Sequence, residues 1–345
     1  MDTEKRKRSP WIYLPGVLLV AAASCAALVV FALHNAEKAV LPEGITSAQQ
    51  ESLTQPGETE RVNSVVRDTS SVPAETSSSA ATAAQTTAGA THTGFTPLPE
   101  LPLMEEKPDK IPNLPTKRID YSYGVASGGK PHQISVDAQK FFDGRGYKAL
   151  ALDTKSEDKR LYLTFDIGYE NGVTAGILDT LKAKKVPAAF FATLHHIKTN
   201  PELAARMITE GHIIGNHSVS HPDFSKLSRE EMIQEIQGFD NYLRANFGYT
   251  APYFRFPEGA YSENALHLAQ ALGYTSVFWS VSWADWDTSK QQGSQFAFDT
   301  VTSRLHPGAV IMLHAVSKDN AGAMGDIIDW AREQGYEFRA LSDYR

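Results

Sequence analysis

The sequence predicts an α/β fold with a parallel, barrel-like sheet, and two observations support this prediction. Between residues 160 and 314, short apolar segments typical of buried strands alternate with segments that have helical spacing. Several predicted strands end in an ionisable side chain, and α/β folds place their chemistry at the carboxyl ends of parallel strands. The predicted domain comprises residues 117–345, which is enough chain for one large core.

The elements of this domain follow one another regularly. Residues 133–152 are expected to begin extended and to continue as a short helix and a turn. Strands are predicted at 160–166, 187–193, 212–218, 253–257, 275–282 and 308–314, and helices at 172–186, 200–211, 228–248, 262–273 and 296–305. The helix at 228–248 has the strongest signal, because Ser228 and Glu231 have the spacing of a capping box.

The N-terminal residues predict a single-pass anchor in the cell membrane. Residues 11–33 carry no charge, and a helix of that length would measure roughly 34 Å, enough to cross a hydrocarbon core of about 30 Å. The basic segment 1–10 predicts a cytoplasmic N-terminus, with everything after the span outside the cytoplasm. A cleaved signal peptide and lipoprotein processing at Cys25 stay open as alternatives.

Residues 34–116 are rich in Ser, Thr, Ala and Pro and have no sustained apolar period. Such a segment buries too little apolar surface to offset its chain entropy, and its prolines favour an extended spacer. We therefore predict a disordered stalk between the anchor and the domain. A short folded piece within residues 47–68 stays open.

Composition limits the partners. The net charge of -7 gives no reason to expect nucleic acid, and the 5 Trp, 13 Tyr and 16 Phe are sufficient for a core and a sugar-binding cleft. Cys25 is the single cysteine of the sequence. An intrachain disulfide, a thiolate metal site and a cysteine nucleophile in the domain are therefore not expected.

Ionisable side chains follow five of the predicted segments, and a barrel would gather them on one face. They are Asp166, His217 with His221, Arg255, Asp285 and His314. Histidines four residues apart can bind one metal ion. Pro222 disfavours a helical His221 and predicts a tight turn. The alternative for these two residues is a pair of half-exposed turn histidines.

The other groups fit acid–base chemistry. Arg255 can be a fixed partner for a carboxylate, or it can form a surface ion pair worth about 0–1 kcal/mol. Asp285 lies between Trp283 and Trp286 and can orient a histidine, or it can be a capping residue beside a core tryptophan. His314 ends an apolar strand, where it can be a general acid or a structural histidine.

The ordered motifs TFDIG, HSVSHP, RFPEG, DW and MLH resemble the five motifs of the polysaccharide deacetylase family, also called the NodB-homology or carbohydrate esterase 4 family, over residues 161–341. TFDIGYENGVT, EGHIIGNHSVSHPD, HPGAVIMLH and AVSKDNA are similar to its delta-lactam-biosynthetic branch, which acts on muramic acid in peptidoglycan. The resemblance implies a distorted (β/α)7-type barrel, a monomeric catalytic domain, and metal-assisted hydrolysis of N-acetyl groups on peptidoglycan strands towards muramic delta-lactam.

The resemblance also implies roles for the acid–base residues. Asp166 would be the catalytic base and Arg255 would hold its carboxylate. His314 would be the general acid, oriented by Asp285. Each of the two reactive groups would thus have its own charged partner.

The same resemblance implies which residues bind the metal ion, stabilise the oxyanion and line the acyl pocket. His217 and His221 would bind a divalent metal ion, with zinc as the expected ion. The backbone N–H of Glu258 would help to form the oxyanion site. Trp286 and Leu313 would line the acyl pocket.

The sequence departs from the family at Ile167, where most members have a metal-binding aspartate and the delta-lactam branch often has asparagine. We therefore expect a weakened metal site. Phe256 replaces a small residue or proline and is expected to alter the rim of the site. Two other functions stay open: a catalytically inactive protein that binds wall glycans, and a deacetylase of N-acetylglucosamine polymers.

Overall fold

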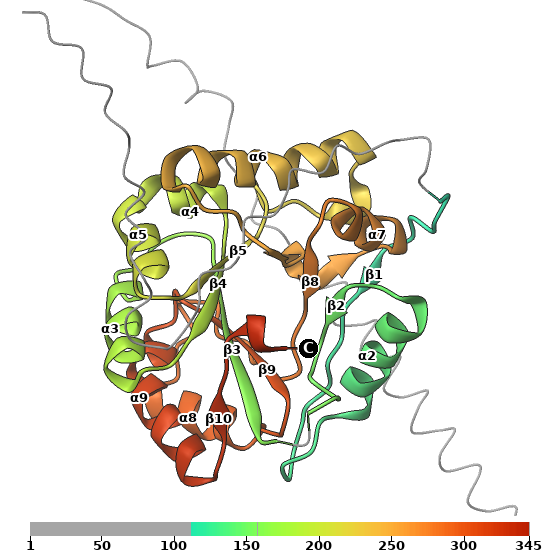
Figure 1. Cartoon of the computed structure of the whole chain (residues 1–345). Coiled ribbons are helices and arrows are strands. Elements are labelled where there is room, and N and C mark those ends of the chain that lie inside the picture. The colour runs from blue at the N-terminus through green and yellow to red at the C-terminus, as the bar shows by residue number, and fades with distance from the viewer. Residues whose placement is uncertain (1–111, 157, 345) are drawn as a thin grey trace, which may run out of the picture. The chain divides into compact units, whose positions relative to one another are not determined.

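The computed structural model describes residues 112–156 and 158–344 (Figure 1). The predicted cytoplasmic segment, the predicted membrane span at 11–33 and most of the predicted stalk lie outside these residues. Within the described part of the chain, no helix is long and apolar enough to cross a membrane.

The strands form one curled parallel sheet and a separate antiparallel pair. The sheet has eight strands, with the order β10-β3-β4-β5-β6-β8-β2, and β9 pairs with β3. Its strands are β2 (Ala149–Leu150), β3 (Arg160–Ile167), β4 (Ala188–Ala192), β5 (Ile213–Asn216), β6 (Tyr253–Phe254), β8 (Thr275–Val277), β9 (Ala309–His314) and β10 (Glu337–Phe338). The pair is β1 (Ile119–Asp120) with β7 (Ala260–Tyr261).

The sheet curls because β9 contacts the segments that follow β2 and β8, the two strands at the opposite end of the strand order. Single bridges join Leu152 to Ala309 and Val281 to Ile311. The backbone N–H of Met312 donates to the carbonyl of Val281 at 2.9 Å. The predicted parallel, barrel-like sheet is therefore confirmed as a curled half-barrel.

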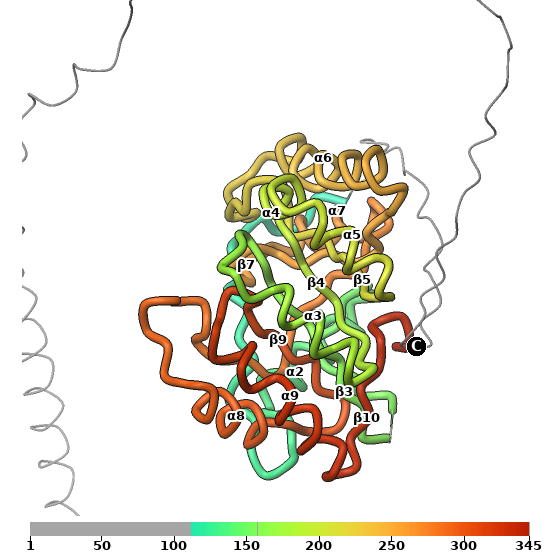
Figure 2. The backbone as a smooth tube through the Cα atoms, turned by 90° about the vertical axis from the view of Figure 1, so that its left-hand side faces the viewer, coloured from blue at the N-terminus to red at the C-terminus, as the bar shows by residue number. Residues whose placement is uncertain are grey.

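Helices surround this sheet, as Figure 1 shows, with α3, α5 and α9 on one side and α2 and α7 on the other. In the view turned by 90°, α6 crosses one end of the described unit and α8 and α9 lie at the other (Figure 2). The α-helices are α2 (Gln133–Arg145), α3 (Thr174–Lys184), α4 (Leu194–Thr199), α5 (Pro201–Thr209), α6 (Arg229–Phe247), α7 (Glu263–Ala271), α8 (Ser294–Thr302) and α9 (Lys318–Glu333). Short 3-10 turns occupy Phe224–Lys226, Pro257–Gly259 and Leu341–Asp343.

Local signals located some elements and missed others. The capping box at α6 is confirmed, since both hydrogen bonds between Ser228 and Glu231 are present. The extended start expected at residue 133 was wrong, because the imidazole of His132 accepts from the N–H of Ile134 and begins α2 directly. The helices α4 and α9 and the strands β1, β2, β7 and β10 were not predicted.

Aromatic side chains fill the core. The rings of Phe165 and Phe190 on the neighbouring strands β3 and β4 stack with centroids 5.0 Å apart. Phe256 is 1% exposed and contacts Phe254 edge-on with ring centroids at 4.9 Å. The expectation that Phe256 alters the rim of the site was therefore wrong, since its ring is used inside the core.

Candidate active site

A cleft of about 470 Å³ opens where β3, β4 and β9 end. Asp166 and His314 lie opposite each other in the register of β3 and β9. The cleft is lined by Asp166, Gly168, Tyr169, Thr193, His195, Val219, Ser220, His221, Trp286, His314 and Val316. Among the predicted residues, Asp166, His221, Trp286 and His314 therefore meet in one cavity.

Asp166 is 6% exposed and is bound by a buried arginine. Nη1 of Arg255 donates to Oδ1 of Asp166 at 2.5 Å. Burial by itself would raise the pKa of Asp166, but the charge of Arg255 outweighs this and holds the pKa below its usual value. The carboxylate is therefore ionised and fixed in one orientation, with Oδ2 left for other partners.

Arg255 is fully buried and uses its whole guanidinium group. Nε donates to the carbonyl of Val277 at 2.9 Å, and Nη2 donates to Oγ1 of Thr164 at 2.9 Å. The guanidinium also lies over the ring of Phe191, 4.1 Å from its centroid. The alternative of a surface ion pair is excluded, and the rigid fork of Arg255 sets the position of the Asp166 carboxylate.

His217 has the properties of a metal ligand. It is 3% exposed, and its Nδ1 lies 2.9 Å from the carbonyl oxygen of Arg255, which requires Nδ1 to carry the proton and to donate. Its Nε2 is then an acceptor and lies 3.7 Å from Oδ2 of Asp166. Burial lowers the pKa of His217 to about 4, so the ring is neutral at pH 7 and can coordinate through Nε2.

His221 lies beside His217 because the chain turns tightly after β5. Ser218 and His221 have φ values of 72° and 60°, and the two imidazole rings are 4.8 Å apart. Left-handed backbone is costly for residues other than glycine, and its use here holds His221 at the mouth of the cleft. The turn predicted from Pro222 is thus observed.

The third position of the family's metal site has no donor atom. The Ile167 side chain is 1% exposed, belongs to the hydrophobic core and does not line the cleft. Within the described residues, no group of three or more His, Cys, Asp or Glu is arranged to hold a metal ion. The residues present fit two-histidine coordination, with the remaining positions left to water or substrate.

His314 is held by Asp285. Its Nδ1 donates to Oδ1 of the fully buried Asp285 at 2.6 Å, and its backbone N–H donates to Oδ2 at 2.7 Å. Burial lowers the pKa of His314, but the hydrogen bond and charge of Asp285 outweigh it, so the pKa is raised. His314 is therefore favoured in its protonated form, and Nε2 is free to face the cleft.

Asn320 is a site residue that the sequence reasoning missed. Its side-chain amide donates to Oδ2 of Asp285 at 2.5 Å and to the carbonyl of His314 at 3.3 Å, and its Oδ1 accepts from Nε1 of Trp283. It therefore fixes the orienting carboxylate from the first turn of α9. Its signal was present in the AVSKDNA segment, but only the fold of α9 gives it a partner.

We expect Asp285→Asn to move the alkaline limb of the pH–activity profile to lower pH. With His314 as the general acid, activity should be lost as pH rises through the pKa of His314, which Asp285 raises. Without that charge, burial dominates and lowers the pKa, and kcat/KM at pH 7 should fall by about ten- to a hundredfold. Rates measured across pH would test this, with an unchanged acid limb as the control. An alkaline limb at the wild-type position would contradict the role of Asp285.

The remaining predicted residues have different surroundings. The N–H of Glu258, at a left-handed residue (φ 58°), donates to no other described residue and so can serve an oxyanion. Trp286 is 58% exposed and its ring centroid is 5.9 Å from that of His314. Leu313 is fully buried and is not among the residues that line the cleft. The predicted roles of Glu258 and Leu313 stay predictions.

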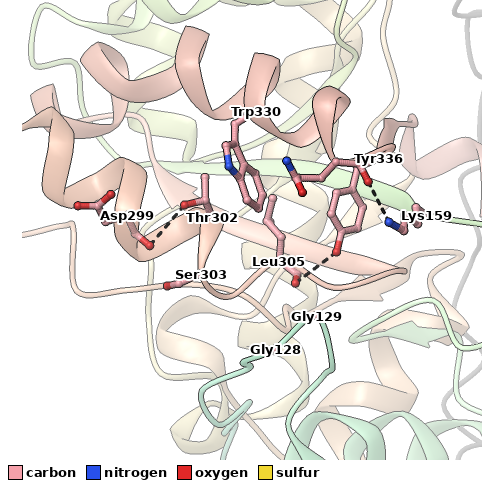
Figure 3. Close-up of a pocket in the computed structure, with 10 residues that line it drawn as sticks. Gly128, Gly129, Lys159, Asp299, Thr302, Ser303, Leu305, Trp330 and Tyr336 are labelled. Atoms are coloured by element: carbon pink, nitrogen blue, oxygen red, sulfur yellow. Dashed lines mark hydrogen bonds between the residues drawn. The ribbon is translucent and has the colours of Figure 1, made fainter.

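A second cavity, of about 540 Å³, lies beside the first residues of β3 and β10 (Figure 3). Figure 3 shows Trp330, Leu305 and Tyr336 bordering the same space. The hydroxyl of Tyr336 donates to the carbonyl of Leu305, and Nζ of Lys159 donates to the carbonyl of Gln334. Its lining includes none of the residues predicted for the site.

Comparisons with known proteins agree with this geometry. The family profile described as polysaccharide deacetylase matches residues 153–277. Peptidoglycan-N-acetylmuramic acid deacetylase PdaA of Bacillus subtilis (strain 168) is 42% identical over 236 residues, which are 68% of this chain and 88% of that protein. The structure of Bacillus subtilis PdaA, a family 4 carbohydrate esterase, matches with a TM-score of 0.64 and 37% identity over 67% of this chain and 98% of that one.

A further structural relative is a mutant of BA3943 from Bacillus anthracis, described as a CE4 family pseudoenzyme with restored enzymatic activity. It matches with a TM-score of 0.52 and 26% identity over 55% of this chain and 68% of that one. The extent of the match to PdaA in sequence and in structure decides the assignment. This chain belongs to the polysaccharide deacetylase family.

Proposed function

We propose that this protein is a peptidoglycan N-deacetylase that hydrolyses the N-acetyl group of N-acetylmuramic acid, as a step towards muramic delta-lactam. The observation that carries the proposal is the pairing of Asp166 with Arg255 and of His314 with Asp285 around one cleft. An acid and a base, each oriented by its own buried partner, are what amide hydrolysis needs. The relationship to PdaA supports muramic acid as the substrate.

The reaction consumes one water and yields acetate and a free amine. Oδ2 of Asp166, the oxygen not bound by Arg255, takes a proton from the water that attacks the acetyl carbon. The N–H of Glu258 stabilises the negative oxygen that forms. Nε2 of His314 then donates a proton to the leaving nitrogen as the C–N bond breaks, while Asp285 stabilises the imidazolium.

His217 and His221 would hold a divalent ion, with zinc as the expected ion. A bound ion of this kind polarises the acetyl carbonyl and lowers the pKa of water from 15.7 to about 7. The neutral ring of His217 suits this role, and its Nδ1–H, which donates to the carbonyl of Arg255, fixes the ring plane. The apolar Ile167 makes the site weaker than that of family members with an aspartate there.

The setting of the enzyme is also a proposal. A membrane anchor at 11–33 would hold residues 117–345 outside the cytoplasm at the end of the stalk, residues 34–116. Peptidoglycan strands are then the partner that this location offers. A monomeric catalytic domain suffices, because every group in the proposed reaction comes from one chain.

Acetate release by the full chain from peptidoglycan strands stripped of their peptides tests the proposal. We expect release to stop with chelator and to return with added Zn²⁺, Co²⁺ or Mn²⁺. Analysis of the amino sugars should show free amines on muramic residues. Free amines on glucosamine residues alone would instead identify a deacetylase of N-acetylglucosamine units.

A catalytically inactive glycan-binding protein is the second candidate, and Ile167 is the observation that favours it. We expect Ile167→Asp to reduce the Zn²⁺ concentration needed for half-maximal activity by at least about tenfold, since even outer-shell changes alter metal affinity by about 10–100-fold. Ile167→Leu is the matched control, because it keeps the position apolar. Glycan binding without acetate release in the wild type, together with release by Ile167→Asp, would support the second candidate.

A further inference from the structure

His195 lies in the cleft but has no part in the proposed reaction. It occupies the first turn of α4, directly after β4, where Oγ1 of Thr193 caps the helix by accepting from the N–H of His196 at 3.3 Å. The side chain of His195 is exposed and lines the cleft with Asp166 and His314. The next residue, His196, is fully buried, so the helix presents one histidine to the cleft and one to the core.

Several polar side chains of the cleft already have partners. Asp166 is bound by Arg255, the hydroxyl of Ser220 donates to Glu235 at 2.7 Å, and that of Thr193 donates to the carbonyl of Gly168 at 3.0 Å. The ring of His195, in contrast, has no hydrogen-bond partner among residues 112–156 and 158–344. Its imidazole is therefore available to a ligand.

Three other side chains of the cleft also have a donor without a partner among the described residues, but each differs from His195 in its predicted role or its chemistry. His221 is a predicted metal ligand, and Trp286 is predicted to line the acyl pocket. The hydroxyl of Tyr169 also has no partner among the described residues, and its side chain is 47% exposed. A phenol suits a sugar hydroxyl or a ring face, whereas an imidazole donates an N–H in both its protonation states and can also carry a positive charge.

The cleft otherwise lacks a cation suited to a free anion. No lysine or arginine lines it, and Arg255, which lies behind it, is fully buried and engaged with Asp166. Among the side chains that line the cleft, only the histidines can therefore offer a substrate carboxylate a donor that can also carry a positive charge. With His314 and His221 assigned to the reaction, His195 remains.

Muramic acid brings such a carboxylate. It differs from glucosamine by a lactyl ether on C3, the ring carbon next to C2, which carries the N-acetyl group. When the acetyl group lies between Asp166 and His314, the lactyl group must therefore lie within one sugar's width, in the same cleft. The shared cavity of about 470 Å³ contains both the reactive pair and His195.

We propose that His195 is a specificity-determining residue, whose imidazole N–H donates a hydrogen bond to the lactyl carboxyl of the muramic residue. This inference rests on the proposed function. The contact selects muramic over glucosamine residues, because only the muramic residue carries the acceptor. It also holds the lactyl carboxyl beside the amine that deacetylation releases.

The test compares peptidoglycan strands stripped of their peptides with the same strands after their lactyl carboxyls have been reduced to alcohols. For the wild-type full chain, kcat/KM should be about 10- to 100-fold lower on reduced strands, the usual effect of losing a hydrogen bond to a charged group. His195→Phe should have this lower kcat/KM on both kinds of strand, mainly because its KM for the unreduced strands is raised. His195→Asn keeps an N–H donor and should restore part of the preference.

Tyr169→Phe is the matched control, since it removes only the rival donor and should leave the preference unchanged. A preference that survives in His195→Phe would overturn the inference while leaving the proposed function intact, as would its loss in Tyr169→Phe alone. A wild-type chain that releases no acetate from either strand under any metal would overturn the proposed function and the inference with it. Thermal unfolding of each variant checks that the fold is retained.

Discussion

Asp166→Asn is expected to lower kcat/KM by about 10²–10⁴-fold, the contribution of a positioned general base. The amide keeps nearly the same shape and can still accept from Nη1 of Arg255, so the cleft should keep its form. It cannot take a proton from water, however, and the attacking nucleophile is then not generated. The loss should therefore appear in kcat rather than in KM.

Steady-state acetate release with saturating Zn²⁺ measures this effect. Asp326→Asn is the matched control, because Asp326 is an exposed residue of α9 outside the cleft and the same charge is removed. Its activity should stay within about twofold of the wild type, as for surface changes away from the site. If Asp166→Asn also keeps a rate within about twofold of the wild type, another group is the base, and the assignment of the catalytic base to this cleft fails.

Arg255→Met is expected to lower the free energy of unfolding by about 3–5 kcal/mol. The substitution leaves Asp166 as a buried charge without its counter-ion, and breaking a buried pair costs this much because the remaining charge stays desolvated. The carbonyls of Val277 and Phe278 and the hydroxyl of Thr164 lose their donor as well. Urea unfolding of the purified chain provides the measurement.

The double variant Arg255→Met with Asp166→Asn separates charge from packing. Once the unpaired carboxylate is gone, part of the stability should return, which gives an interaction free energy between the two positions. Catalysis should not return, since the base is absent. A loss below about 1 kcal/mol in Arg255→Met would be the behaviour of an exposed ion pair and would contradict the buried geometry.

Local patterns predicted most of the elements of this fold. The apolar run of β3 and the capping box of α6 lie within a few residues of sequence, so their structures follow from local preferences. The short strands were predicted too long: residues 253–257 hold a strand of two residues, Tyr253–Phe254. Strand ends depend on which neighbour pairs with them, and no local pattern contains that neighbour.

The candidate site was predicted only as a set of motifs. Arg255 could be a surface residue or a buried partner by sequence, and the choice depends on Asp166, 89 positions away. His195 carried no signal, and Asn320 lay in the AVSKDNA segment without an assigned role, because an isolated amide or imidazole has no role until the fold supplies its neighbours. The prediction that Phe256 alters the rim of the site was wrong for the same reason. Its ring packs against Phe254 and Phe278, which the curled sheet brings together.

The sequence by itself therefore determined most of the strands and helices and the chemical types at the strand ends, because both depend on local spacing. The tertiary structure decided which of those groups are paired, which are buried and which stay free. These properties come from contacts between distant segments, such as β3 with β9 and Asp285 with His314. Burial and pairing set the protonation states, and so only the folded chain separates a paired carboxylate, a paired histidine and an uncommitted histidine within one cleft.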